Sequence, residues 1–202
     1  MVFARSLARA LDGTRASMGR MMWRQLTTAL RERIAPSLRD RIGIHQARYR
    51  YTREEVGRVW LTVDGREIVQ FDTSSYVRRR AELAGELREA NGLRPYGDPG
   101  GHPDYLAADA AAVDILRRAG QYDDYSALAD LESYLSLSIE DALRSPSPLI
   151  RGLAMIDRRV GKRRLRAMRS TNDEHSFVRE LYELRRQADG MISGEVNGQG
   201  HR

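Results

Sequence analysis

The sequence predicts an α+β fold: a short N-terminal helix, a three-stranded antiparallel sheet and then five or six helices. Strand-like runs rich in Ile, Val and Tyr all precede residue 73. Helical spacing of apolar residues and helix-capping signals fill most of the chain that follows. Strands and helices therefore segregate along the chain rather than alternate.

The first helix is expected over residues 23–34, where an apolar residue recurs every fourth position. Strands are expected over 41–51, 56–63 and 66–72. The last two flank Asp64-Gly65, and this dipeptide between apolar runs is a strong signal for a tight hairpin.

A two-residue turn fixes the pairing of the hairpin, so Leu61 is expected to face Ile68. Alternation then gives one core face, consisting of Val59, Leu61, Val63 and Ile68. The opposite face would carry Trp60, Val69 and Phe71 beside Arg58. Such a half-apolar face is either covered by another helix or stacks nucleic-acid bases.

Helices are expected after the sheet, each with a recognisable start or stop. The expected set is 75–90 before Asn91-Gly92, 104–119 before Gly120, 124–135, a short helix capped by Ser138, one capped by Ser147 with Pro148 first, and one opened by a capping box of Thr171 and Glu174. The last helix would place Phe177, Leu181, Leu184 and Ala188 along one stripe.

The expected domain spans residues 22–190. Residues 1–21 are expected to be a disordered or mis-assigned N-terminal extension, with Met22 as the start, and 191–202 a disordered tail. Arg5 and Arg9 interrupt the apolar run that a signal peptide needs, and no run approaches the ~20 apolar residues of a membrane helix. A cytoplasmic protein without a membrane partner is therefore expected.

Charge is unevenly distributed along a chain of net charge +6, whose 34 basic residues include a single lysine. Residues 98–141 have a net charge of −8, residues 142–169 of +8 and residues 22–53 of +6. Blocks of opposite sign either neutralise each other or form separate docking faces. The arginine bias is open to two interpretations, a GC-rich genome or phosphate binding.

The most basic segment is residues 157–169. Apolar spacing slips between Val160 and Leu165, so either a helix breaks at Gly161 or Leu165 leaves the core. On an unbroken helix, Arg158, Lys162, Arg166 and Arg169 would share one face. The candidate nucleic-acid contacts are Arg158, Arg159, Lys162, Arg163, Arg166 and Arg169.

Catalytic and cofactor motifs are missing from the sequence. It contains no phosphate-binding loop, no G-x-G-x-x-G after a strand, no G-x-S-x-G, no H-E-x-x-H and no cysteine. We therefore expect no cofactor and no metal. Asp98, His102 and Asp104 form the one cluster that could serve acid–base chemistry or a metal, and their alternative is a polar surface loop.

A second basic set interleaves arginines with aromatic residues over residues 39–53. Strand alternation would split Arg48 and Arg50 from Tyr49 and Tyr51, which weakens a base-stacking platform. The complete set is Arg39, Arg41, Arg48, Arg50 and Arg53 with His45, Tyr49 and Tyr51.

Several motifs occur together in this chain: Ala35-Pro36-Ser37-Leu38-Arg39, Gly57-Arg-Val-Trp-Leu-Thr-Val-Asp-Gly65, Ala154-Met-Ile-Asp-Arg-Arg-Val-Gly-Lys-Arg-Arg-Leu165 and Glu174-His175. In this combination the chain resembles a family of uncharacterised small bacterial proteins over about residues 22–190. The resemblance implies a cytoplasmic bacterial protein that starts at Met22. It implies no activity and no catalytic residues.

Three functional hypotheses follow. The leading one is a non-enzymatic protein that binds RNA or DNA through residues 158–169. The alternative is a protein-interaction module that docks a basic partner on the acidic block 98–141. The third is a hydrolase-like enzyme that uses the loop from Asp98 to Asp104.

Overall fold

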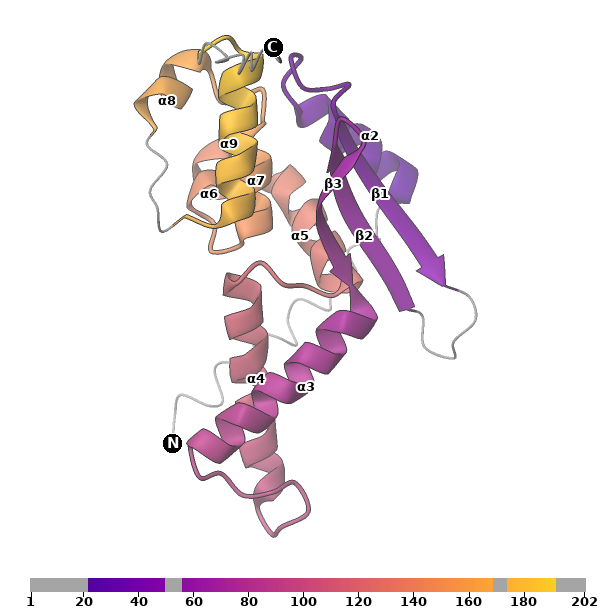
Figure 1. Cartoon of the computed structure of the whole chain (residues 1–202), viewed down its shortest axis with the longest axis vertical. Coiled ribbons are helices and arrows are strands. Elements are labelled where there is room, and N and C mark those ends of the chain that lie inside the picture. The colour runs from indigo at the N-terminus through magenta and orange to yellow at the C-terminus, as the bar shows by residue number, and fades with distance from the viewer. Residues whose placement is uncertain (1–21, 50–55, 169–173, 192–202) are drawn as a thin grey trace, which may run out of the picture.

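The structure is a computed structural model that describes residues 22–49, 56–168 and 174–191 (Figure 1). The expected α+β fold is confirmed, because one helix precedes a three-stranded antiparallel sheet and further helices follow it. The predictions for residues 1–21 and for the tail beyond Met191 lie outside the described residues. Within the described ranges, no helix has the length and apolar character needed to cross a membrane.

Seven helices follow the sheet in the described part of the chain, rather than five or six, because residues 148–167 form two helices instead of one. In chain order the elements are α2 (Trp23–Arg33), β1 (Ile42–Tyr49), β2 (Val56–Val63), β3 (Arg66–Asp72), α3 (Thr73–Ala90), α4 (Gly101–Arg118), α5 (Asp124–Ser136), α6 (Ile139–Arg144), α7 (Pro148–Met155), α8 (Lys162–Ala167) and α9 (Ser176–Ala188).

The sheet has the order β1-β2-β3, and the predicted turn between β2 and β3 is present. Asp64 and Gly65 both have positive φ, 50° and 79°, as a two-residue hairpin turn requires. Beyond the turn the predicted register is wrong: an irregularity between Leu61 and Thr62 makes Leu61 pair with Val69 instead of Ile68. A bulge of this kind adds one residue to one strand and shifts every later pair.

The shifted register changes which residues of β3 face the core. Phe71 pairs with Val59 and is 1% exposed, although the regular register placed it on the opposite face. Its ring meets the ring of Tyr122 edge-on, with the centroids 5.2 Å apart. The opposite face of the sheet instead carries Trp60, stacked on His45 with Arg58 over its ring.

Helix starts differ from the predictions by a few residues because other side chains provide the caps. Asp72 accepts a hydrogen bond from the Ser75 N–H, so α3 begins at Thr73 rather than at Ser75. His175 caps α9, while Thr171 lies outside the described residues and Glu174 pairs with Arg151. The predicted apolar stripe of α9 is confirmed, since Phe177, Leu181 and Leu184 are buried.

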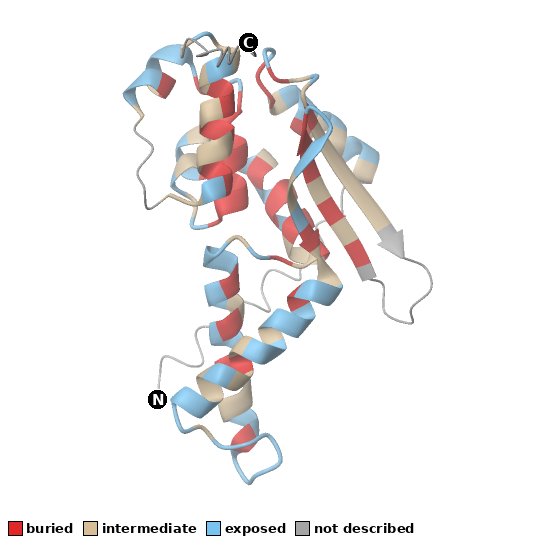
Figure 2. Cartoon of the chain, in the orientation of Figure 1, coloured by how far each residue is buried: buried red, intermediate tan, exposed pale blue. Residues whose placement is uncertain are grey.

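The main core lies between the sheet and the helices α2, α5, α7 and α9 (Figures 1 and 2). Helices α3 and α4 form a hairpin that extends away from this body, with much of its surface exposed (Figure 2). Its two helices pack on small residues such as Ala84, Ala108 and Ala112, and Arg80 pairs with Asp109 between them.

The hairpin turn allows a direct stability test. Gly65→Val should lower the free energy of unfolding by ~1 kcal/mol or more, because a β-branched residue disfavours the positive φ of this position. Chemical denaturation monitored by circular dichroism measures the change. The matched control is Gly97→Val, where φ is not positive and a Cβ meets no atom within 4 Å. Equal effects of the two substitutions would contradict the assigned turn.

Candidate functional site

The basic segment begins where α7 ends. Helix α7 stops at Met155, and α8 starts at Lys162 after Gly161, whose backbone is extended. Leu165 stays in the core and is 0% exposed. Of the two alternatives, a broken helix or an exposed Leu165, the structure shows the broken helix. The break begins at Ile156, five residues before Gly161. Arg158 therefore does not share one face of an unbroken helix with Lys162 and Arg166, and Arg169 lies outside the described residues.

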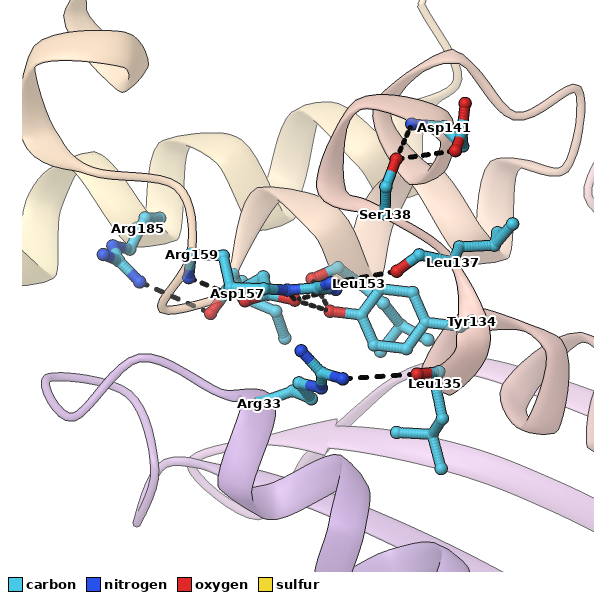
Figure 3. A network of polar contacts seen from close by, with 11 residues as sticks. Arg33, Tyr134, Leu135, Leu137, Ser138, Asp141, Leu153, Asp157, Arg159 and Arg185 are labelled. Carbon is cyan, nitrogen blue, oxygen red and sulfur yellow. Dashed lines mark hydrogen bonds and ion pairs between the residues drawn. The ribbon is translucent and has the colours of Figure 1, made fainter.

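The turn between α7 and α8 is held by a buried carboxylate, that of Asp157, which is 0% exposed (Figure 3). Its Oδ2 accepts hydrogen bonds from the Tyr134 hydroxyl and from Nε and Nη2 of Arg159, the latter two at 2.9 and 2.7 Å. Its Oδ1 accepts the Arg159 N–H at 2.7 Å. The backbone of Asp157 also bridges to Ile34, just after α2.

Arg159 belongs to this internal network. Besides Asp157, its guanidinium donates to the Leu137 carbonyl at 2.9 Å, so it connects the α7–α8 turn to the end of α5. The hydrogen bonds to Asp157 raise the pKa of Arg159, and burial followed by the charge of Asp157 raises the pKa of the Tyr134 hydroxyl. The sequence prediction grouped Arg159 with the contact residues, but its donors are engaged within the fold.

Two further bases of the segment, Arg164 and Lys162, have partners on α6 and at the end of α9. Arg164 forms a bidentate pair with Glu140, which raises the pKa of Arg164 and lowers that of the carboxyl. Lys162 Nζ donates to the Asp189 carbonyl at 3.1 Å and remains exposed. The Asp189 carboxylate is in turn bound by Ser37 and by the buried Arg185.

Three arginines remain exposed, Arg158, Arg163 and Arg166, and none of them pairs with an acid of the described ranges. At 100° per residue, Lys162, Arg163 and Arg166 project within an arc of about 100° on α8. Arg158 lies beside the end of α2, since its N–H donates to the Arg33 carbonyl at 2.7 Å. We call Arg158, Lys162, Arg163 and Arg166 the basic surface; Arg169 lies outside the described residues.

Five of the ten acids of block 98–141 form ion pairs in the described ranges, and four of these five pair with arginines outside the basic segment. Within the described ranges, Arg164–Glu140 is the one ion pair that joins the two blocks. The other pairs of the block are Asp104 with Arg94, Asp109 with Arg80, Asp114 with Arg118 and Asp130 with Arg117. In the described chain, no acid of the block therefore forms an ion pair with the four residues of the basic surface.

Two members of the cluster of Asp98, His102 and Asp104 contact neighbouring residues of the loop. Asp104 Oδ2 accepts both the N–H and Nε of Arg94 at 3.1 Å, and these hydrogen bonds lower the pKa of its carboxyl. The His102 ring meets the Tyr96 ring edge-on, with the centroids 5.5 Å apart. No group of three or more His, Cys, Asp or Glu residues that could hold a metal ion occurs in the described part of the chain.

The second basic set is only partly described. Arg41 forms a bidentate pair with Asp64 at the hairpin turn, which lowers the pKa of the Asp64 carboxyl. His45 lies between Trp60, on which it stacks, and the Thr62 hydroxyl. Arg50, Arg53 and Tyr51 lie outside the described residues, and β1 contains Arg48 and Tyr49 at its end.

Sequence reasoning missed the network around Asp157. Asp157 is the one acid among residues 142–169, and such an isolated charge in a basic block was an available signal. Tyr134 carried no signal, because its partner Asp157 lies 23 positions away. The spacing of Arg185 and Asp189 indicates their ion pair, but not the hydrogen bonds of Arg185 to the carbonyls of Ile156 and Val160.

Comparison with known proteins adds one match. The model of the SF0329 protein family matches residues 22–186. No curated protein and no solved structure matches the chain significantly.

Two neighbouring arginines should respond differently to the same substitution. Arg159→Gln should lower the free energy of unfolding by about 2–3 kcal/mol, because the buried Asp157 loses its charged partner. Arg163→Gln removes an exposed charge and should change it by less than about 0.5 kcal/mol. Urea unfolding of both variants measures the difference. A destabilising Arg163→Gln, or a neutral Arg159→Gln, would show that the two roles are wrongly assigned.

Proposed function

The chain belongs to the SF0329 protein family, and for this member we propose a binding function without catalysis, in which the basic surface contacts RNA or DNA. The observation that carries the proposal is the exposure of Arg158, Arg163 and Arg166 without an acidic partner in the described ranges. Block 98–141 contains ten acidic residues, but in the described ranges a single one, Glu140, forms an ion pair with the basic segment.

The chemistry of the surface fits a phosphate backbone. Guanidinium groups bind phosphate oxygens in a bidentate manner, and each neutralised phosphate releases counterions to solution. Residues 156–168 contain no aromatic side chain, so the surface offers no platform on which bases could stack. The proposed contact is therefore with the backbone and tolerates different nucleotide sequences.

A nucleic acid also fits this surface better than an acidic protein does. The centre of a protein interface is generally apolar and desolvated. The exposed large hydrophobic residues of the described chain lie elsewhere, at Met22, Val77, Tyr96, Leu106 and Ile115. A surface of cations without an apolar centre is typical of phosphate binding.

Binding to a short duplex and a single strand at several salt concentrations tests the proposal. Arg158→Gln, Arg163→Gln and Arg166→Gln combined should weaken binding and make the log–log salt slope shallower by about 2–3 units, at about 0.7–0.9 per lost phosphate contact. Fluorescence anisotropy provides the affinities, and circular dichroism should show an unchanged fold, since exposed charges contribute little to stability.

The control carries the same charge loss on α2, α3 and α4, with Arg24, Arg78 and Arg118 replaced by Gln. Both triple variants have a net charge of +3 instead of +6. The control should keep the slope of the unmodified protein. An equal loss of affinity and of salt slope in both variants would show that net charge, and not the position of the arginines, determines binding. An absence of binding at low salt by the unmodified protein would disprove the proposal.

A further inference from the structure

A cavity of about 450 Å³ is lined by α2, the connection 34–41, β1, Thr62 of β2 and Gly65 of the hairpin turn. Figure 1 shows α2 behind β1, which is an edge strand of the sheet. This volume falls in the range of pockets that hold small molecules, roughly 300–1,000 Å³. The cavity includes described members of the second basic set, Arg39, Arg41 and His45, which the basic surface does not use.

The lining of the cavity is cationic. Its charged residues are Arg31, Arg39, Asp40 and Arg41, a net charge of +2. Arg41 is committed to Asp64, outside the lining. Arg31 pairs with Asp40 at 2.8 Å, but the two side chains are 61% and 88% exposed, so water screens this pair and a stronger ligand can replace it.

Arg39 supplies the least satisfied group of the lining. Its Nε is buried without a hydrogen-bond partner, and no described residue accepts a hydrogen bond from any part of its guanidinium. Buried donors in folded proteins are almost always paired, because an unpaired one loses its hydration without compensation. The Nη nitrogens of Arg39 likewise have no acceptor among the described residues, and because Arg39 lines the cavity, an oxyanion there would provide acceptors for them.

The remaining walls are ordered and partly apolar. The Nε2 atom of His45 lies 3.0 Å from the Thr62 hydroxyl, and its ring stacks on Trp60, which fixes the ring plane. This arrangement requires Gly43, because a Cβ there would come within 2.4 Å of both His45 Nε2 and Thr62 Oγ1. Ile34, Ile42 and Ile44 supply the apolar part of the lining.

We propose that this cavity binds a small molecule through its phosphate or carboxylate group, with Arg39 as the main donor and Arg31 as the second. The apolar wall contacts the rest of the ligand. None of the four residues of the basic surface lines the cavity, so the site is distinct from the proposed nucleic-acid contact.

Thermal unfolding in the presence of inorganic pyrophosphate tests the site, with sodium chloride at equal ionic strength as the reference. The full chain should show a rise in Tm of about 3 °C at a concentration about ten-fold above Kd. Arg39→Gln should lose this rise. Arg24→Gln, on α2 and outside the lining, should keep it.

A second substitution covers the case in which Arg39→Gln does not fold. Thr28→Tyr, at an exposed position of α2, narrows the cavity and should also remove the rise in Tm. An unchanged rise in the folded variants, or no rise for the unmodified chain up to about 10 mM pyrophosphate, would overturn the proposal.

Measuring each set of variants in the other set's assay shows whether the oxyanion belongs to a small molecule or to a nucleic acid. For a small-molecule site, Arg39→Gln keeps oligonucleotide affinity, while the variant that lacks Arg158, Arg163 and Arg166 keeps the response to pyrophosphate. Loss of oligonucleotide affinity in Arg39→Gln would instead assign the cavity to a nucleic-acid phosphate and overturn the small-molecule site.

Discussion

The burial of one carboxylate, that of Asp157, constrains the rest of the structure. An ionised group with 0% exposure is stable in a protein interior only when hydrogen bonds and an opposite charge replace its hydration. Tyr134 from α5 and Arg159 from the α7–α8 turn provide them, while the backbone bridge to Ile34 attaches the end of α2. Three segments that are far apart in sequence thus meet at one group.

This constraint also divides the arginines of the basic segment. Arg159 is oriented inward by Asp157, and Arg164 is held against α6 by Glu140. The break that Asp157 stabilises separates Arg158 from α8, so that Arg158 lies next to α2. The basic surface therefore consists of residues from a turn and a short helix, and the fold rather than a helical repeat sets their spacing.

Local patterns predicted the local features well. The Asp64-Gly65 turn, the stripe of α9 and the caps by Ser138 and Ser147 depend on residues a few positions apart, and all are present. The β2–β3 bulge was not predictable, because side-chain packing of Val69 and Phe71 against distant helices decides it. The inward orientation of Arg159 was also not predicted, although Asp157 is only two positions away, because its other partners, Leu137 and Tyr134, are distant in the sequence. The cavity beside β1 likewise combines α2 and strand residues that no spacing relates.

The α3–α4 hairpin has a consequence for the order in which the chain acquires its structure. Ten residues, 91–100, join its two helices, so closing this loop costs little conformational entropy. The contacts between its helices, including Arg80 with Asp109, all lie within residues 73–118, and contacts at moderate sequence separation form faster than those that join distant parts of a chain. The hairpin extends from the body (Figure 1), and Thr73 and Arg117 at its base bind Asp124 and Asp130 of α5. We therefore expect its outer part to open at a lower free energy than the core, with the base still attached.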